Sequence, residues 1–285
     1  ALTDLALSTD EDVFKLWEGL GYYSRCRNLL HTARYIQFHH QGVFPNTYQG
    51  ILALKGIGEY TAAAIASFAF DLPHAVVDGN VVRILSRVFS IEDDFTSTSG
   101  KKRFQSLAQS LLPVDRAAAY NQAIMDLGAL ICKPRNPQCD ICPLQKMCKS
   151  HQQGNMEDFP KKKDKKALKK RHFHFLCIED GDNLYLVRRH EKDIWKDLHT
   201  PYLLESENSE KPDFSILKKS MEPICFMELK QILTHQEING YFYRVQSGDV
   251  KKTELQKLII IPRSRIGNFA FPRMIVSFFQ KTDYL

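Results

Sequence analysis

The sequence lacks a long apolar run, and its N-terminus lacks a basic segment followed by an apolar one. A helix that spans a bilayer needs about 18 or more consecutive apolar residues, so no membrane segment is expected. The opening residues, ALTDLALSTDEDV, also do not have the order of charges of a secretory signal. The chain does not begin with Met and starts in the middle of a helical pattern, which predicts a fragment or a processed chain.

The seven cysteines are an odd number, and Cys26, Cys177 and Cys225 each stand alone. This distribution argues against a secreted disulfide framework and favours a reducing cytoplasm. The charge excess is modest, with a net charge of +6 at pH 7. Such an excess is compatible with a nucleic-acid partner but does not establish one.

The first half of the chain has no segment with the two-residue period of a strand. At 285 residues with 44% hydrophobic content, the chain is long enough for two domains. Apolar periodicity predicts helices up to about residue 150, over residues 13–20, 25–38, 60–70, 80–89, 101–112 and 117–131.

The composition changes after residue 150. Residues 151–171 hold Gly, Pro and a dense run of Lys, which is typical of a solvated basic linker. Residues 172–285 are expected to form a smaller α/β domain. Its strands are predicted at 172–178, 183–188, 241–245 and 258–261, the first two as a hairpin around EDGD, with a closing helix at 272–280.

Four clustered cysteines follow the pattern C-x6-C-x2-C-x5-C, at Cys132, Cys139, Cys142 and Cys148. The loop between them is rich in proline and polar residues, so a metal centre is the expected source of its order. Four ordinary thiols are the alternative. The spacing alone accepts zinc and an iron–sulfur cluster equally well.

Two glycines flank an apolar residue at Gly56-Ile57-Gly58, just before a predicted helix. This pattern predicts a tight turn between helices, with Ile57 in the core. Backbone N–H groups at the start of the second helix would then be free to bind a phosphate. A simple turn without a ligand fits the same residues.

An aspartate follows an apolar run in VVDGNVVRILSR and precedes the next predicted helix. Asp78 is well placed as an ordinary N-cap. It is also well placed as a partly desolvated carboxylate that stabilises a developing cation or takes part in acid–base chemistry.

Four motifs in this order resemble one family. LKGIGEYTAAAI, VVDGNVVRILSR, YNQAIMDLGALIC and the cysteine loop are similar to the helix-hairpin-helix DNA glycosylases that carry an iron–sulfur cluster. The earlier WEGLGYYSRCRNL narrows the resemblance to the adenine DNA glycosylases of the MutY type.

The resemblance implies a mainly α helix-hairpin-helix glycosylase domain over 1–150 with a [4Fe-4S] loop, a linker over 151–171, and a MutT/Nudix-like domain over 172–285 that recognises 8-oxoguanine. It implies hydrolysis of the N-glycosidic bond of adenine, flipped out of double-stranded DNA where it faces 8-oxoguanine or guanine. A monomer in a bacterial cytoplasm, associated with the nucleoid, is expected.

The family's site residues carry over by position. Asp78 matches the catalytic aspartate and Asn80 a polar residue beside it, while Tyr60 stands where relatives with lyase activity place a nucleophilic lysine. A phenol cannot form a Schiff base, so a monofunctional enzyme is expected. Gln122 matches a residue at the edge of the flipped adenine. Tyr23 matches an aromatic wedge that replaces lost stacking, although one of Tyr22 and Tyr23 is expected in the core.

The C-terminal domain is expected to recognise and not to hydrolyse, because the R-E-x-x-E-E pattern that holds Mg²⁺ in pyrophosphatases is absent between Arg188 and Leu229. Thr234 and His235 resemble the family's loop that inspects 8-oxoguanine; a plain surface histidine is the alternative for His235. In the cysteine loop, Arg135 is expected to meet DNA phosphates.

One family feature has no match. The glutamate that serves as general acid lies upstream of anything that aligns with residue 1, so we expect these 285 residues to bind poorly and excise nothing. Two other functions stay open: an endonuclease III-like glycosylase/lyase, and a non-enzymatic DNA-binding module stabilised by its cluster.

Overall fold

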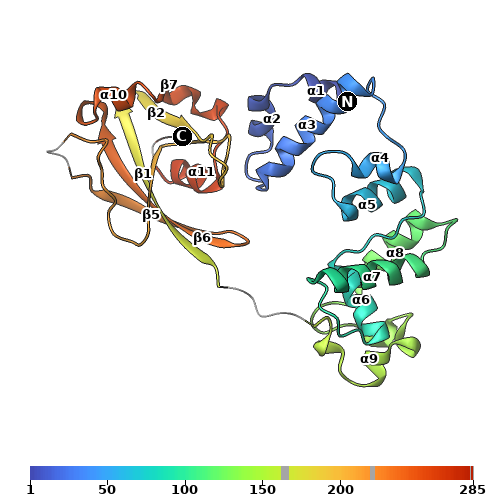
Figure 1. Cartoon of the computed structure of the whole chain (residues 1–285). Helices are drawn as coiled ribbons and strands as arrows, with labels where there is room; N and C mark the ends of the chain where they lie inside the picture. The colour runs from blue at the N-terminus through green and yellow to red at the C-terminus, as the bar shows by residue number, and fades with distance from the viewer. Residues whose placement is uncertain (162–166, 219–221, 283, 285) are drawn as a thin grey trace. The chain divides into compact units, whose positions relative to one another are not determined.

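The structure is a computed structural model that describes residues 1–161, 167–218, 222–282 and 284. The chain divides into two compact units (Figure 1). One unit joins Ala1–Gln37 to Lys166–Leu285, and the other is Phe38–Lys165. Residues 1–37 were expected to belong with the other helices, but they fall in the same unit as the residues after 166. The predicted domain boundaries at 150 and 171 stay predictions. Part of the predicted linker, 162–166, lies outside the described residues.

The unit Phe38–Lys165 is helical. Its α-helices are α4 (Tyr48–Leu52), α5 (Glu59–Phe70), α6 (Gly79–Phe89), α7 (Thr98–Leu111), α8 (Ala117–Leu130) and α9 (Lys149–Gln152). Short 3-10 turns follow in and after the cysteine loop: η1 (Cys139–Ile141), η2 (Gln145–Met147) and η3 (Met156–Asp158).

Two apolar clusters hold this unit together. The larger one joins α6, α7 and α8 through Val81, Leu85, Phe104 and Ala108, with Tyr120 and Ile124 packed against it. The smaller one lies between α4 and α5. Small residues on α5 allow this close packing, because an alanine side chain lets two helices approach.

The other unit opens with three helices, α1 (Leu2–Leu7), α2 (Asp10–Leu16) and α3 (Tyr23–His39), the last of which crosses the unit boundary. Thr9 caps α2 because its side chain accepts the Asp12 N–H. Phe14, Cys26 and Leu30 from these helices are buried in the same core as the strands that follow residue 166.

A mixed sheet follows in this unit and has seven strands among the described residues. Its strands are β1 (Lys169–Asp180), β2 (Asn183–Arg188), β3 (His199–Thr200), β4 (Tyr202–Ser206), β5 (Cys225–Ile232), β6 (Gln236–Gln246) and β7 (Ile259–Pro262). The order is β3-β2-β1-β6-β5, with β4 paired to β1 and β7 to β2. Only β1 and β6 run parallel among the pairs described.

Helix α11 (Arg273–Gln280) covers one face of the sheet, and shorter helical turns lie at η4 (Ser247–Asp249), α10 (Lys252–Leu255) and η5 (Arg263–Asn268). Phe278 stacks on Phe242 with ring centroids 4.1 Å apart, and Phe242 stacks on Phe175 at 4.8 Å. Gly240 permits this approach, since a Cβ there would lie 2.6 Å from the sulfur of Met274.

The predicted helices and the predicted strand pattern are confirmed, with ends that shift by a few residues. The hairpin around EDGD pairs Asp180 with Asn183. Strands β3, β4 and β5 were not predicted. Among the described residues no helix is both long and apolar enough to cross a bilayer.

Candidate active site and metal centre

A carboxylate is held at the N-terminus of α6. One oxygen of Asp78, Oδ1, accepts the Val81 N–H at 2.8 Å, and the other, Oδ2, accepts an N–H from the Asn80 amide at 2.9 Å. Asp78 is therefore an N-cap, as the simpler sequence interpretation held, and it is half-buried. The two hydrogen bonds fix the plane of a carboxylate that still faces partly outward. The bond from Val81 is the N-cap bond, and an N-cap alone would not require the second bond from Asn80.

Arg83 connects this carboxylate to the cysteine loop. Its guanidinium donates to Asn80 Oδ1 at 2.8 Å, to the Gly128 carbonyl oxygen at 2.6 Å and to the Cys132 carbonyl oxygen at 2.7 Å. The side chain is 8% exposed. Burial lowers the pKa of Arg83, as does Arg87, while Cys132 and Asp78 raise it. A continuous hydrogen-bonded path thus runs from Asp78 to the first cysteine.

Helices α6 and α8 cross at a very close contact between Asn80 and Gly128. A Cβ built on Gly128 would lie 2.5 Å from the Cβ of Asn80, which no side chain tolerates. Glycine at this position lets Asn80 sit against α8 while its amide reaches Asp78.

The Gly56-Ile57-Gly58 turn joins α4 to α5 as predicted. Gly56 has φ +81°, a conformation that glycine adopts without strain. Ile57 packs on the α4–α5 cluster. Gly58 is the N-cap of α5 and offers no side chain to its first turn, so the leading N–H groups of α5 keep their capacity for an anion.

Two further predicted residues lie on α5 and α8. Tyr60 is in the first turn of α5 and is 48% exposed. Gln122 is exposed on α8, where its amide donates to Asp126 at 2.8 Å. Its neighbour Asn121 is buried and ties α8 to Ser67 of α5 and to the backbone of His74 and Val76. Asn121 thereby fixes the segment that leads to Asp78.

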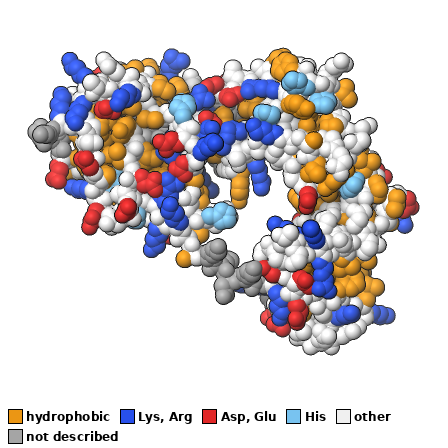
Figure 2. All heavy atoms as spheres, viewed as in Figure 1, with side chains coloured by type: hydrophobic (Ala, Val, Ile, Leu, Met, Phe, Trp, Pro, Cys, Tyr) orange, Lys and Arg blue, Asp and Glu red, His pale blue; other side chains and the backbone are white. Residues whose placement is uncertain are grey.

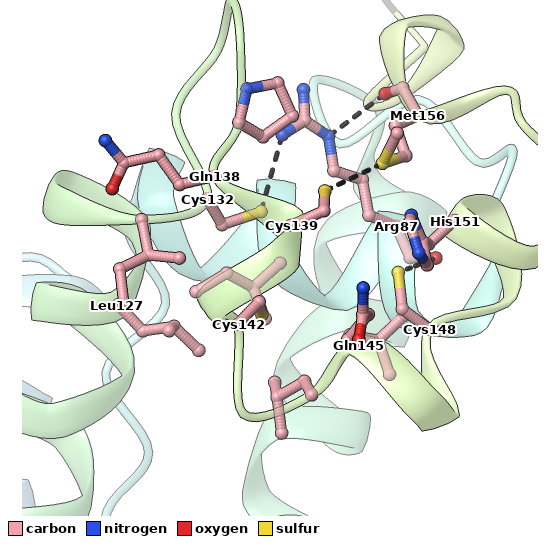
Figure 3. Close-up of a pocket in the computed structure, with 15 residues that line it drawn as sticks. Arg87, Leu127, Cys132, Gln138, Cys139, Cys142, Gln145, Cys148, His151 and Met156 are labelled. Atoms are coloured by element: carbon pink, nitrogen blue, oxygen red, sulfur yellow. Dashed lines mark hydrogen bonds between the residues drawn. The ribbon is translucent and has the colours of Figure 1, made fainter.

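The four cysteines line one cavity, together with Arg87, His151 and Met156 (Figure 3). None of the seven cysteines forms a disulfide. Burial and the three neighbouring thiols raise the pKa of Cys139, while Arg87 lowers it. A free thiol at this position therefore resists ionisation, and a metal that binds thiolates would offset that cost.

Arg87 holds the cysteine loop from inside and is 2% exposed. Its guanidinium donates to the carbonyl oxygens of Lys133 at 2.7 Å and Met156 at 3.0 Å, and approaches the Cys132 sulfur at 3.4 Å. This buried cation faces the space between the sulfurs, as expected for a centre that carries negative thiolates.

The lining of this cavity offers four thiols to a metal that binds thiolates. Four cysteines suit a zinc ion and an iron–sulfur cluster alike, so the lining by itself does not select between them.

A groove in the unit that contains the sheet brings together the other predicted residues. Its lining includes Tyr22 just before α3, Tyr23 at the first position of α3, and Thr234 and His235 between β5 and β6. Tyr23 is half-buried, stacks on Phe14 and donates to the Phe271 carbonyl oxygen at 3.3 Å. Tyr22 is 61% exposed, and its hydroxyl lies 3.4 Å from that of Thr234. The exposed ring is therefore Tyr22, and the packed one is Tyr23.

Sequence reasoning missed Arg83, Arg87, Asn121 and Gly128. A signal for the arginines exists in VVRILSRVF, where two arginines lie inside an otherwise apolar helix. A buried arginine needs several acceptors, so this pattern indicates a structural network. Basic side chains elsewhere are spread over both units among acidic ones on the face shown in Figure 2, and Arg135 is exposed in the cysteine loop.

Comparison with known proteins finds matches for two segments of the chain and several similar relatives. Residues 1–113 match the HhH-GPD superfamily of base excision DNA repair proteins, and residues 132–148 match the iron-sulfur binding domain of endonuclease III. An adenine DNA glycosylase of Buchnera aphidicola (subspecies Baizongia pistaciae) is 39% identical over 66% of this chain and 53% of its own length. That of Rattus norvegicus is 45% identical over 56% of this chain and 32% of its own.

A solved thermostable thymine-DNA glycosylase is 29% identical, covers 53% of this chain and 70% of its own, and superposes with a TM-score of 0.49. The chain spans about half the length of the Buchnera relative and a third of the rat one. The chain is a homologue of the adenine DNA glycosylases, with an HhH-GPD segment and an endonuclease III-type iron–sulfur domain, and that domain implies a [4Fe-4S] cluster.

Proposed function

We propose that this protein is a monofunctional adenine DNA glycosylase of base-excision repair. Its substrate is adenine paired with 8-oxoguanine or guanine in double-stranded DNA. The observation that carries the proposal is the Asp78 carboxylate, oriented by Val81 N–H and the Asn80 amide on the same helical scaffold as the Gly56-Gly58 turn. The relatives' name, adenine DNA glycosylase, supports the choice of base.

Asp78 stabilises the cation that forms as the glycosidic bond breaks. Loss of the base leaves positive charge on the sugar, and a fixed carboxylate lowers the energy of that state without reorganising. The hydrogen bonds from Val81 and Asn80 hold the carboxylate in one orientation before the substrate arrives. Gln122, exposed on α8, reads the edge of the flipped adenine after leaving its contact with Asp126.

The hairpin anchors the DNA backbone. N–H groups at the uncapped start of α5 bind a phosphate near the flipped nucleotide. Arg135 adds a contact to phosphate from the cysteine loop, which contributes affinity without sequence preference. Within this role the cluster orders the loop, and Arg83 and Arg87 tie that loop to α6.

Tyr60 argues against the endonuclease III-like alternative. It stands exposed in the first turn of α5 with a phenol and no amine, so it cannot form the Schiff base that a lyase requires. A monofunctional reaction releases adenine and leaves an intact strand.

The groove around Thr234 is the proposed recognition site for 8-oxoguanine. Thr234 and His235 are exposed there, and the exposed Tyr22 ring, which has the Arg25 guanidinium 4.5 Å from its centroid, enters the base stack when DNA binds. We assign the wedge to Tyr22 in place of Tyr23, because the Tyr23 ring stacks on Phe14 and its hydroxyl donates to the Phe271 carbonyl oxygen.

The expectation that these 285 residues bind poorly and excise nothing stays a prediction. No glutamate here matches the family's general acid, and a positioned acid contributes about a hundredfold or more to the rate, so adenine release within an ordinary assay time should be undetectable.

The test combines binding and base release on one A:8-oxoguanine duplex. The protein should shift this duplex at lower concentration than an undamaged one, and long single-turnover incubations should release adenine slowly. Asp78→Asn should bind equally well and release less, because asparagine is as good an N-cap as aspartate and leaves the helix intact. Asp78→Ala removes both the carboxylate and the N-cap, and serves as the control that should lose binding as well as adenine release.

Three results would contradict the proposal. Strand cleavage, or a borohydride-trapped covalent complex, would indicate a lyase. Equal shifts of damaged and undamaged duplexes would remove the lesion preference. Base release at an unreduced rate from Asp78→Asn would show that the carboxylate does no chemistry.

A further inference from the structure

One side chain in the cysteine cavity has a buried polar atom without a partner. His151 lines the cavity, and its Nδ1 is fully buried yet makes no hydrogen bond within the described parts of the chain. An imidazole nitrogen left unpaired away from water is costly, so such atoms are rare in folded proteins. A partner is therefore expected from whatever occupies the cavity.

The protein groups near His151 are already engaged. Cys148 Sγ lies 3.5 Å from the Arg87 carbonyl oxygen and 3.6 Å from Ser150 Oγ. The Arg87 guanidinium is directed to Cys132 Sγ and to the carbonyl oxygens of Lys133 and Met156. Figure 3 draws His151 among the cysteines, on the side of Cys148.

We propose that His151 donates a hydrogen bond from Nδ1–H to a sulfur of the iron–sulfur cluster. The sulfurs of such a cluster accept hydrogen bonds and donate none, so only the protonated Nδ1 is satisfied there. Arg87 supplies a second donor, at Cys132. The two residues thus contact the site from different elements, α6 and α9.

This contact should raise the reduction potential of the cluster. A hydrogen bond to a cluster sulfur stabilises the reduced, more negative state over the oxidised one. Without the donor, the ratio of reduced to oxidised cluster at a fixed applied potential should fall about tenfold, which is about 59 mV for a one-electron couple.

The experiment measures the cluster's potential in His151→Leu and His151→Asn by voltammetry on the full chain. Leucine removes the donor, whereas the asparagine amide places an N–H near the position of Nδ1. His151→Leu should shift the potential down and His151→Asn should restore most of it. His31→Leu, at an exposed histidine on α3, is the matched control and should not change it.

A second readout covers the case in which His151→Leu assembles no cluster. Protein labelled with 15N-histidine should show a nitrogen hyperfine coupling to the paramagnetic cluster, and His151→Asn should lose the label's signal. Absence of that coupling in the parent would overturn the proposal. The proposal would also be wrong if His151→Leu and His151→Asn had the same reduction potential, whether or not that potential differed from the parent's.

Discussion

A single buried arginine joins the two chemical parts of this molecule. Arg83 donates to Asn80, which orients Asp78, and to the carbonyl oxygen of Cys132, which begins the cysteine loop. Both ends of the path therefore depend on one guanidinium. Loss of that group leaves several buried acceptors unpaired, which is more damaging than the loss of an exposed ion pair.

Arg83→Met should destabilise the helical unit by about 3 kcal/mol or more, since each unpaired buried acceptor costs about 1–3 kcal/mol. Adenine release should fall with it, because Asn80 loses the contact that holds its amide. Thermal unfolding followed by circular dichroism measures the first effect. Arg103→Ala removes an exposed ion pair with Asp93 and should change stability by less than about 1 kcal/mol. Equal effects of the two variants would rule out the network.

Two buried histidines make the stability of the sheet unit depend on pH. Burial lowers the pKa of His174 and of His199 from 6.5 to about 4. In His174, Ser206 Oγ donates to the Asn208 carbonyl oxygen, so it accepts from Nε2–H, while Nδ1 accepts from the Tyr243 hydroxyl. The neutral ring is thus the form that fits.

The unfolded chain binds these protons at a higher pH than the folded chain. The contribution of the two neutral histidines to the free energy of unfolding is therefore fully present above pH 6.5 and declines as the pH falls toward 4. Urea midpoints between pH 4 and 7.5 should show this decline. His174→Gln, which carries no proton to bind, should flatten it. A decline of the same slope in that variant would assign the effect to other groups.

At the scale of elements, the crossing of α6 and α8 sets the position of the candidate catalytic residues. Asn80 fits against α8 only because residue 128 has no side chain. The α6 helix can therefore not shift along α8 without moving the amide away from Asp78.

Gly128→Ala should push the two helices apart and cost about 1–3 kcal/mol, the usual range for overpacking. It should also reduce adenine release more than DNA binding. Gly267→Ala, where an added Cβ meets nothing within 4 Å, should be nearly silent. The melting temperature and single-turnover adenine release are the two measurements. A lower melting temperature with normal release would show that the α6–α8 contact does not position the catalytic residues.

Helices and central strands could be predicted from the sequence because their periodicity is strong. The long α8 segment and β2 were found almost residue by residue. The edge strand β5 was missed, since its outer positions hold charged and apolar side chains in turn and its pattern is mixed. Strands β3 and β4 are short and depend on pairing with β2 and β1, which no local pattern reveals.

The site was predictable to the extent that single residues carry chemistry. Asp78 and the four cysteines stand out by type and position, and Asn80 was assigned through the resemblance alone; the structure places Asn80 against Asp78 and the four cysteines around one cavity. Gly128 could not be assigned, because its role arises from a helix contact that sequence spacing does not encode. For Arg83 the apolar context indicates a buried network but does not reveal its acceptors. For Tyr22 and Tyr23 only burial distinguishes the adjacent rings.

At the scale of the whole molecule, the cluster and the sheet belong to different units. The four cysteines of the loop, from Cys132 to Cys148, lie in Phe38–Lys165, whereas both tryptophans, Trp17 and Trp195, lie in the other unit. Tryptophan fluorescence therefore reports on one unit only. The signal of helices at 222 nm includes the long helices α5, α6, α7 and α8 of the other.

Removal of iron by a chelator should lower the thermal transition seen at 222 nm and leave the tryptophan transition unchanged. The cysteine loop has only short 3-10 turns and depends on Arg87 and on its metal, so its loss exposes the ends of α6 and α8. The sheet unit keeps its own core around Phe175, Phe242 and Phe278. Chelator-treated and untreated protein are compared in the same buffer. A parallel fall in both transitions would show that the two units unfold as one, and no fall in either would show that the loop orders itself without metal.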